Sequence, residues 1–170
     1  FAGHLYNTYC PLWKTPDDAQ PHWFVTAGFG SFGLMLPDPR QGVWKVELEY
    51  DSPPNVALVD VDGDGRLEAG YAAINDATFV CRDVWSGAVE WELELPSAPN
   101  AATITADLDG DGRGDFFCGR YAIGVDSQGQ GTLKWEAPVH FSWPIIADVD
   151  GDGEGELIGS AAGGIVLLDK

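Results

Sequence analysis

Short apolar runs alternate with short polar stretches along most of this chain. From residue 56 onward the runs come in pairs, one directly before and one directly after a strongly acidic stretch. Runs of about four to eight residues bounded by turn-forming residues have the length of β-strands. The pattern therefore predicts two strands around each acidic stretch. The runs before the acidic stretches are 56–59, 102–105 and 144–147, and those after them are 67–74, 116–123 and 157–162.

A second pair of strands is predicted in each repeat of this pattern. A turn containing Gly or Gln is followed by a strand that carries one tryptophan, at Trp44, Trp91 and Trp135. The acidic stretches begin at Asp60, Asp107 and Asp148, which gives repeats of 47 and 41 residues. Four short strands in a repeat of this length are typical of a β-propeller blade. We expect the tryptophans to pack one blade against the next, with ligand stacking as the alternative.

The predicted fold is thus all-β, with about four β-propeller blades of four antiparallel strands. The first blade would have only three strands, and the last would lack its final strand. An unpaired sheet edge invites pairing with another chain. We therefore expect either part of a larger propeller or docking with further copies through open blade edges. The predicted blades are residues 23–50, 51–96, 97–138 and 139–170.

Residues 1–22 differ from the repeats and are rich in aromatic residues and proline. We interpret this N-terminal segment as a strap that covers the open flank of the first blade. A surface for sugar stacking or a contact with a partner is the alternative. The chain begins at Phe1, so we expect either a removed leader or a longer parent chain.

Three nine-residue acidic segments carry the candidate chemistry. Acidic segment 1 is DVDGDGRLE (60–68), acidic segment 2 is DLDGDGRGD (107–115) and acidic segment 3 is DVDGDGEGE (148–156). Ca²⁺ takes about six to eight oxygen ligands, and alternate residues of a tight loop can point at one centre. The predicted ligands are the carboxylates at positions one, three, five and nine and the backbone carbonyl at position seven. They are Asp60, Asp62, Asp64, Arg66 and Glu68; Asp107, Asp109, Asp111, Arg113 and Asp115; and Asp148, Asp150, Asp152, Glu154 and Glu156.

Turn formation is the alternative reading of these segments, because Asp and Gly are frequent in turns. Closely spaced carboxylates repel one another unless a cation neutralises them, and three copies with the same offsets favour a metal. Mg²⁺ fits less well than Ca²⁺ because it requires strict octahedral geometry and usually retains several waters. The segments therefore predict about three calcium ions per chain.

The charge of the chain narrows the class of partner. The formal net charge is −18, and three bound calcium ions would reduce it to −12. A surface this acidic disfavours nucleic acid and anionic membranes, and no apolar run approaches the roughly eighteen residues of a membrane-spanning helix. Calcium, neutral glycans and basic protein surfaces are the favoured partners.

The cysteines and the predicted calcium sites provide information on the cellular location of the protein. Cys10, Cys81 and Cys118 have neither zinc-site spacing nor an even count. We expect Cys81 and Cys118 to be buried as small apolar side chains, with one bridged pair as the alternative. Calcium sites of millimolar affinity are typical of extracellular modules. We therefore expect a secreted or cell-surface location, with the periplasm as a further option.

The acidic segments resemble those of FG-GAP/VCBS-type repeats, which form the calcium-binding β-propellers of integrin alpha subunits and of many secreted bacterial proteins. The resemblance covers about residues 24–170, and it implies a calcium loop between the first two strands of each blade. Phe29-Gly30 and Phe32-Gly33 occur, but no Gly-Ala-Pro follows them. The outer strands with tryptophan are similar to PQQ-type repeats, although the sequence gives no support for a quinone cofactor.

Two functional hypotheses follow. The first is a non-catalytic structural or binding module, in which calcium stabilises the fold and another surface meets a glycan or a protein. The second is a calcium-dependent enzyme similar to polysaccharide lyases. Lyase chemistry needs a base to remove a proton, and the sequence nominates none.

Overall fold

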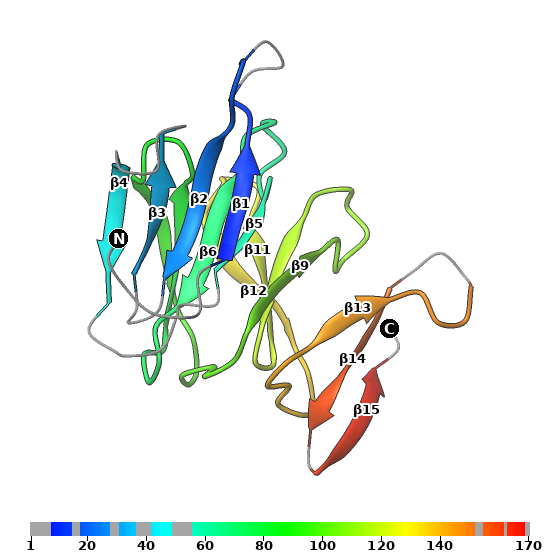
Figure 1. The fold of residues 1–170 in the computed structure, drawn as a ribbon. Helices are drawn as coiled ribbons and strands as arrows, with labels where there is room; N and C mark the ends of the chain where they lie inside the picture. Colours follow the sequence, from blue (N-terminus) through cyan, green and yellow to red (C-terminus); the bar gives the residue numbers. More distant parts are fainter. Residues whose placement is uncertain are drawn as a thin grey trace.

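The computed structural model describes residues 8–14, 18–27, 31–36, 42–48, 56–151, 155–161 and 163–168. Within these ranges the chain forms fifteen β-strands in four antiparallel sheets and contains no helix (Figure 1). Each sheet retains two edge strands, so the sheets do not close into a barrel. The all-β prediction is confirmed, and the sheets have the size of blades.

Within each sheet, every strand pairs with the next strand along the chain, so each sheet is a series of hairpins. Sheet 1 contains β1 (Thr8–Leu12), β2 (His22–Ala27), β3 (Ser31–Met35) and β4 (Gly42–Glu47). Sheet 2 contains β5 (Ala57–Val59), β6 (Glu68–Ala72), β7 (Thr78–Asp83) and β8 (Val89–Glu94). Sheet 3 contains β9 (Thr103–Ala106), β10 (Asp115–Cys118), β11 (Tyr121–Val125) and β12 (Gly131–Glu136). Sheet 4 contains β13 (Ile145–Ala147), β14 (Glu156–Ala161) and β15 (Gly164–Leu168).

The hydrophobic core lies between consecutive sheets. One buried cluster joins sheets 1 and 2, where the ring of Phe32 meets that of Tyr71 at a centroid distance of 4.7 Å. A second joins sheets 2 and 3, where Phe79 contacts Phe116 at 5.3 Å. A third cluster joins sheets 3 and 4 and includes Leu157. Face-to-face packing of successive sheets buries the apolar side of each strand.

Tryptophan side chains on two outer strands lock neighbouring sheets together. The indole nitrogen of Trp44 in sheet 1 donates a hydrogen bond at 2.8 Å to the carbonyl of Val84, which directly follows β7 of sheet 2. Its ring covers Gly87, where an added Cβ would lie 2.5 Å from Trp44 Cδ2. In the same way, Trp91 of sheet 2 covers Gly131 of sheet 3. The predicted packing role is confirmed for both tryptophans.

A β-bulge occurs at the same place in the three four-stranded sheets. The outer strand has one extra residue directly before its tryptophan: Val43 in sheet 1, Glu90 in sheet 2 and Lys134 in sheet 3. A bulge re-aims the side chains around it and increases the local twist. These three residues therefore occupy equivalent positions in the three sheets, and we call them the bulge residues.

The prediction of a three-stranded first blade is wrong. Strand β1 pairs with β2 along its whole length, for example Tyr9 with Val25, so the N-terminal segment supplies the fourth strand of sheet 1. Pro11 lies in β1, at the edge of the sheet, where the absence of its N–H is tolerated. The boundary at residue 22 therefore cuts through a sheet. Sheet 4 has three strands within the described residues, as expected.

The three cysteines are free thiols. Cys81 and Cys118 are buried, and Cys10 is exposed. Burial raises the thiol pKa of both buried cysteines, that of Cys118 to about 11. The prediction that Cys81 and Cys118 are buried as small apolar side chains is confirmed. The alternative of one disulfide-bonded pair is wrong.

Candidate metal centres

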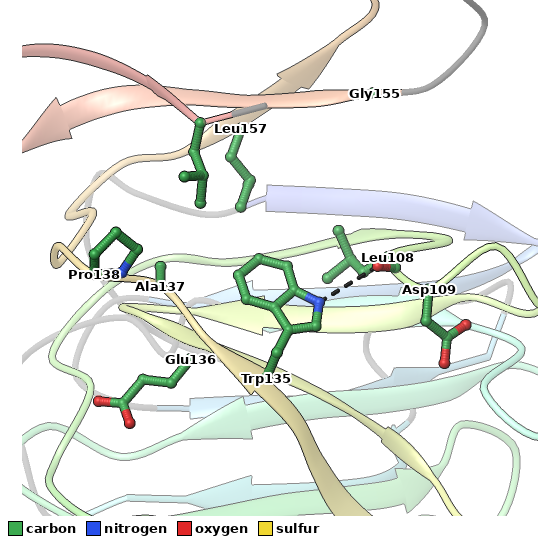
Figure 2. Close-up of a pocket in the computed structure, with 9 residues that line it drawn as sticks. Leu108, Asp109, Trp135, Glu136, Ala137, Pro138, Gly155 and Leu157 are labelled. Atoms are coloured by element: carbon green, nitrogen blue, oxygen red, sulfur yellow. Dashed lines mark hydrogen bonds between the residues drawn. The ribbon is translucent and has the colours of Figure 1, made fainter. Parts of the chain in front are cut away.

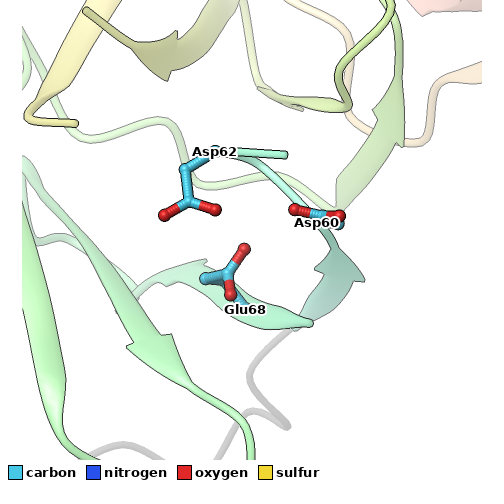
Figure 3. Close-up of side chains that lie close together, drawn as sticks. All are labelled: Asp60, Asp62 and Glu68. Atoms are coloured by element: carbon cyan, nitrogen blue, oxygen red, sulfur yellow. The ribbon is translucent and has the colours of Figure 1, made fainter. Parts of the chain in front are cut away.

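The acidic segments connect the first two strands of sheets 2, 3 and 4, as the sequence pattern predicts. In acidic segment 1, the carboxylates of Asp60, Asp62 and Glu68 point toward one another (Figure 3). One ligand atom from each lies within 4.8 Å of the others. Positions one, three and nine converge in the same way in the other two segments. These sets are Asp107, Asp109 and Asp115, and Asp148, Asp150 and Glu156.

Backbone hydrogen bonds hold the position-one carboxylate in place. Both oxygens of Asp60 accept hydrogen bonds, from Gly63 N at 2.7 Å and from Gly65 N at 2.8 Å. The two glycines have φ of 80° and 85°, a conformation that favours glycine. Asp107 accepts the equivalent bonds from Gly110 and Gly112. The turn is thus built from local contacts that the nine-residue sequence itself specifies.

The position-nine carboxylate is buried at the start of the second strand. Glu68 is only 2% exposed, and its Oε2 accepts a hydrogen bond from Val61 N at 2.8 Å. Asp115 and Glu156 are buried to a similar degree and accept the same bond from position two. One oxygen is held by the backbone, so the other can serve as a ligand.

Burial makes the carboxylates of Glu68 and Asp115 difficult to ionise. The pKa of Glu68 is raised to about 8, chiefly by desolvation; the hydrogen bond from Val61 opposes this shift, and the charges of Glu90, Asp62 and Asp60 contribute to it. Desolvation likewise raises the pKa of Asp115 to about 6. A divalent cation at the cluster would stabilise the charged form. The donor set, which consists only of oxygen, fits a hard cation such as Ca²⁺.

The structure does not place the residues at positions five and seven in the convergent sets. Asp64 and Asp111 are not members of the convergent sets, and each accepts a hydrogen bond from the backbone N–H at position seven. The side chain of Arg66 pairs with Asp83 at 2.8 Å, and that of Arg113 pairs with Asp111. The carbonyls of Arg66 and Arg113 as ligands stay predictions, as do the carboxylates of Asp64 and Asp111.

Acidic segment 3 is described in part. Asp148 accepts a hydrogen bond from Gly151 N at 2.6 Å, which repeats the turn of the other segments. The predicted ligands Asp152 and Glu154 lie outside the described residues.

Comparisons with known proteins identify similar solved structures but no family. No family model matches the chain, and no curated protein matches it significantly. The biofilm matrix protein Bap1 of V. cholerae superposes with a TM-score of 0.62 at 18% identity, over 95% of this chain and 28% of Bap1. The exotype rhamnogalacturonan lyase YesX gives 0.61 at 15% identity, over 96% of this chain and 36% of YesX.

A rhamnogalacturonan lyase of Bacillus licheniformis gives a TM-score of 0.57 at 13% identity, over 90% of this chain and 35% of the enzyme. The chain therefore spans about a third or less of each protein. The likeness is one of fold. All three neighbours are all-β proteins, as this chain is.

Three charged residues beside the acidic segments were not predicted as part of the centres. Asp83 and the bulge residue Glu90 lie near acidic segment 1, and the charges of Asp83, Asp62 and Asp64 add to burial in raising the pKa of Glu90. The bulge residue Lys134 lies near acidic segment 2, with its Nζ 2.7 Å from Asp109 Oδ2. These residues are distant in sequence and reach the segments through strand pairing.

A cavity of about 500 Å³ lies between sheets 3 and 4 (Figure 2). Trp135 faces it, and the indole nitrogen of this residue donates to the carbonyl of Leu108 at 3.4 Å. Leu157 and Leu168 line the other side, while Asp109 and Glu136 add carboxylates. Trp135 thus lies at the junction of two sheets, as predicted, but beside a cavity.

The chemistry of the described residues favours ion binding. No convergent acidic set in the described ranges includes a histidine. His22 packs edge-on against Trp85, and His140 hydrogen-bonds with the carbonyl of Pro99. Within the same ranges, no helix has the length and apolar character that crossing a membrane requires. The arrangement can hold a cation at three hairpins.

Proposed function

We propose that this chain is a calcium-binding β-propeller segment that acts outside the cell as a non-catalytic structural or binding module. The observation that carries this proposal is the convergence, in three copies, of two exposed or half-buried aspartates on a buried carboxylate. Burial of an acid beside like charges is unfavourable unless a cation is bound. Ca²⁺ would bind through the carboxylates at positions one, three and nine, with positions five and seven completing its shell.

The propeller architecture is supported by the way in which the sheets repeat. Successive sheets stack through shared cores, and tryptophans on equivalent strands cover glycines of the following sheet. The resemblance of the acidic segments to FG-GAP/VCBS repeats agrees with this arrangement. The calcium ions would hold the first hairpin of each blade and contribute directly to folding stability.

The partner is proposed to be a glycan, a protein or a further copy of the fold. Sheet 4 exposes Ile145, Ile165 and Leu167, and β15 is an edge strand within the described residues. An exposed apolar sheet face with an open edge favours packing by another blade. An extracellular location agrees with low-affinity calcium sites and with the biofilm matrix protein among the structural neighbours.

Calcium dependence of folding tests this proposal. We expect the melting temperature to fall by about 10 °C or more when EDTA replaces millimolar Ca²⁺, because ions that bind only the native state stabilise it. Mg²⁺ at the same concentration should restore little of the difference. The variant Asp60→Asn/Asp107→Asn/Asp148→Asn should lose most of the calcium effect, while the exposed Glu92→Gln should keep it. Equal melting temperatures in Ca²⁺ and EDTA would disprove the proposal.

A lyase is the second candidate, because two of the structural neighbours are rhamnogalacturonan lyases. Such an enzyme would need a general base of its own to remove a proton beside a uronate carboxylate. The assay is ultraviolet absorbance of unsaturated products, measured on a panel of acidic polysaccharides with calcium present. Activity that survives dialysis and disappears in the triple asparagine variant would favour the enzyme over the binding module.

A further inference from the structure

The three bulge residues differ in charge: one is neutral, one is acidic and one is basic. Val43 in sheet 1 is apolar, and the connection between β1 and β2 has no acidic segment. Glu90 in sheet 2 lies beside acidic segment 1, and Lys134 in sheet 3 lies beside acidic segment 2. Equivalent positions on equivalent strands thus supply a carboxylate to one candidate metal centre and an ammonium group to the next.

The ammonium group of Lys134 lies among the ligands predicted for acidic segment 2. Its Nζ is 2.7 Å from Asp109 Oδ2 and 4.0 Å from Asp111 Oδ2, and its side chain is only 18% exposed. Gly124 on the intervening strand leaves the space for this approach. An added Cβ there would lie 2.6 Å from Lys134 Cε and 2.2 Å from Asp115 Oδ1. A cationic group of the protein itself therefore lies against the cluster.

Acidic segment 1 has additional carboxylates beside it, where acidic segment 2 has the ammonium group of Lys134. Asp83 lies opposite Glu68 in the pairing of β6 with β7, whereas in sheet 3 it is Gly124 that lies beside Asp115. Asp83 is buried and forms an ion pair with Arg66, so this guanidinium compensates the added acid. Glu90 adds a further carboxylate. The first centre therefore has more carboxylates beside it than the second.

We propose that Lys134 is a tethered counter-ion that competes with Ca²⁺ for acidic segment 2, whereas Glu90 strengthens binding at acidic segment 1. This inference rests on the calcium binding proposed above. Acidic segment 1 would then be a high-affinity site that needs its ion. Acidic segment 2 would keep its fold through Lys134 when calcium is scarce and would bind the ion only at higher concentration. The two adjacent hairpins would respond to different calcium ranges.

The test is a calcium titration of the 170-residue chain followed by ¹H–¹⁵N NMR, with the amides of Gly65 and Gly112 as separate reporters of the two segments. In the wild type, we expect the Gly65 amide to reach its midpoint at about tenfold lower Ca²⁺ than the Gly112 amide. Lys134→Met keeps the stem of the side chain and removes the charge. It should lower the Gly112 midpoint about tenfold and leave that of Gly65 unchanged. Glu90→Gln should raise the Gly65 midpoint alone.

Lys45→Met is the matched control, since Lys45 pairs with Glu47 on sheet 1 and its removal changes the net charge equally. It should move neither midpoint. Lys134→Gln provides a second variant in case methionine disturbs the sheet. In EDTA, Lys134→Met should also melt at a lower temperature than the wild type, because the carboxylates of acidic segment 2 lose their counter-ion.

An unchanged or raised Gly112 midpoint in both Lys134 variants, with both segments still binding calcium, would overturn this inference and leave the proposed function intact. Absence of calcium shifts at either glycine, in the wild type and in all variants, would overturn both.

Discussion

The buried carboxylate of Glu68 accepts a hydrogen bond from the backbone nitrogen of Val61, seven residues earlier, at 2.8 Å. This bond closes acidic segment 1 at its base, where the first strand ends and the second begins. Asp115 with Leu108 and Glu156 with Val149 repeat the relationship. The bond fixes one carboxylate oxygen and leaves the other for an ion, so it connects the hairpin geometry to the proposed metal chemistry.

Glu68→Gln should separate the metal role of this side chain from its packing role. Without calcium, the raised pKa keeps Glu68 largely protonated at neutral pH, and glutamine has nearly the same shape as the protonated acid. We therefore expect melting temperatures in EDTA that agree within a few degrees, and at least a tenfold loss of calcium affinity at acidic segment 1. Scanning calorimetry and calcium titration measure the two effects, with Glu92→Gln as the control. A variant that binds calcium normally would contradict the ligand assignment.

Stability without calcium should fall as the pH rises from about 5 to 8. The folded-state pKa values of Glu68 and Asp115 are raised above their ordinary values, to about 8 and about 6. The folded protein then binds more protons than the unfolded chain, so these groups favour folding at low pH and this advantage disappears as they ionise. The loss should be on the order of a few kcal/mol for Glu68.

Urea denaturation in EDTA at several pH values measures this dependence. In millimolar Ca²⁺ the decrease should be much smaller or reversed, because ion binding requires the deprotonated carboxylates and releases protons. A stability in EDTA that rises steadily from pH 5 to pH 8 would contradict the burial of uncompensated acids.

Gly131→Ala tests how tightly sheets 2 and 3 pack. An added Cβ at Gly131 would lie 2.2 Å from Trp91 Cε3, so the ring or the strand must move. We expect a loss of about 1–3 kcal/mol in the free energy of unfolding, measured with urea in millimolar Ca²⁺. Gly164→Ala is the control, since no atom lies within 4 Å of its added Cβ. Equal losses in the two variants would show that the tryptophan contact is not the cause.

The cysteines should react at very different rates with a thiol reagent. Exposed Cys10 should be modified within minutes in the native protein. Cys81 and Cys118 are buried and their thiol pKa values are raised, so they should react only after unfolding. Mass spectrometry of the labelled protein counts the modified sites before and after denaturation. Rapid labelling of Cys81 in the native protein would contradict the core between sheets 2 and 3.

The parts of the structure that follow from local sequence were predictable. Convergence of Asp60, Asp62 and Glu68 depends on a turn whose hydrogen bonds all lie within nine residues, so the repeated offsets indicate it directly. The paired strands and the packing of Trp44 and Trp91 follow from apolar runs and spacing. In each case the information lies in one short stretch and is repeated along the chain.

The features that the sequence analysis missed depend on contacts between distant residues. Strand β1 contains Pro11, which argues against a central strand and is tolerated here at a sheet edge. Lys134 is 25 residues from Asp109 and reaches it through a bulge and two strand pairings. A bulge changes the direction of a side chain without a clear sequence signal. The one available signal was the change from Val43 to Glu90 to Lys134 before equivalent tryptophans.

Native mass spectrometry tests the central claim, that the acidic segments hold calcium, most directly. The wild-type chain should carry three calcium ions in millimolar Ca²⁺ and lose them in EDTA. The Asp60→Asn/Asp107→Asn/Asp148→Asn variant should carry none above the non-specific background, whereas the control Glu92→Gln should carry three. A wild-type chain without specifically bound calcium, or a triple variant that binds the same number of ions, would contradict the account.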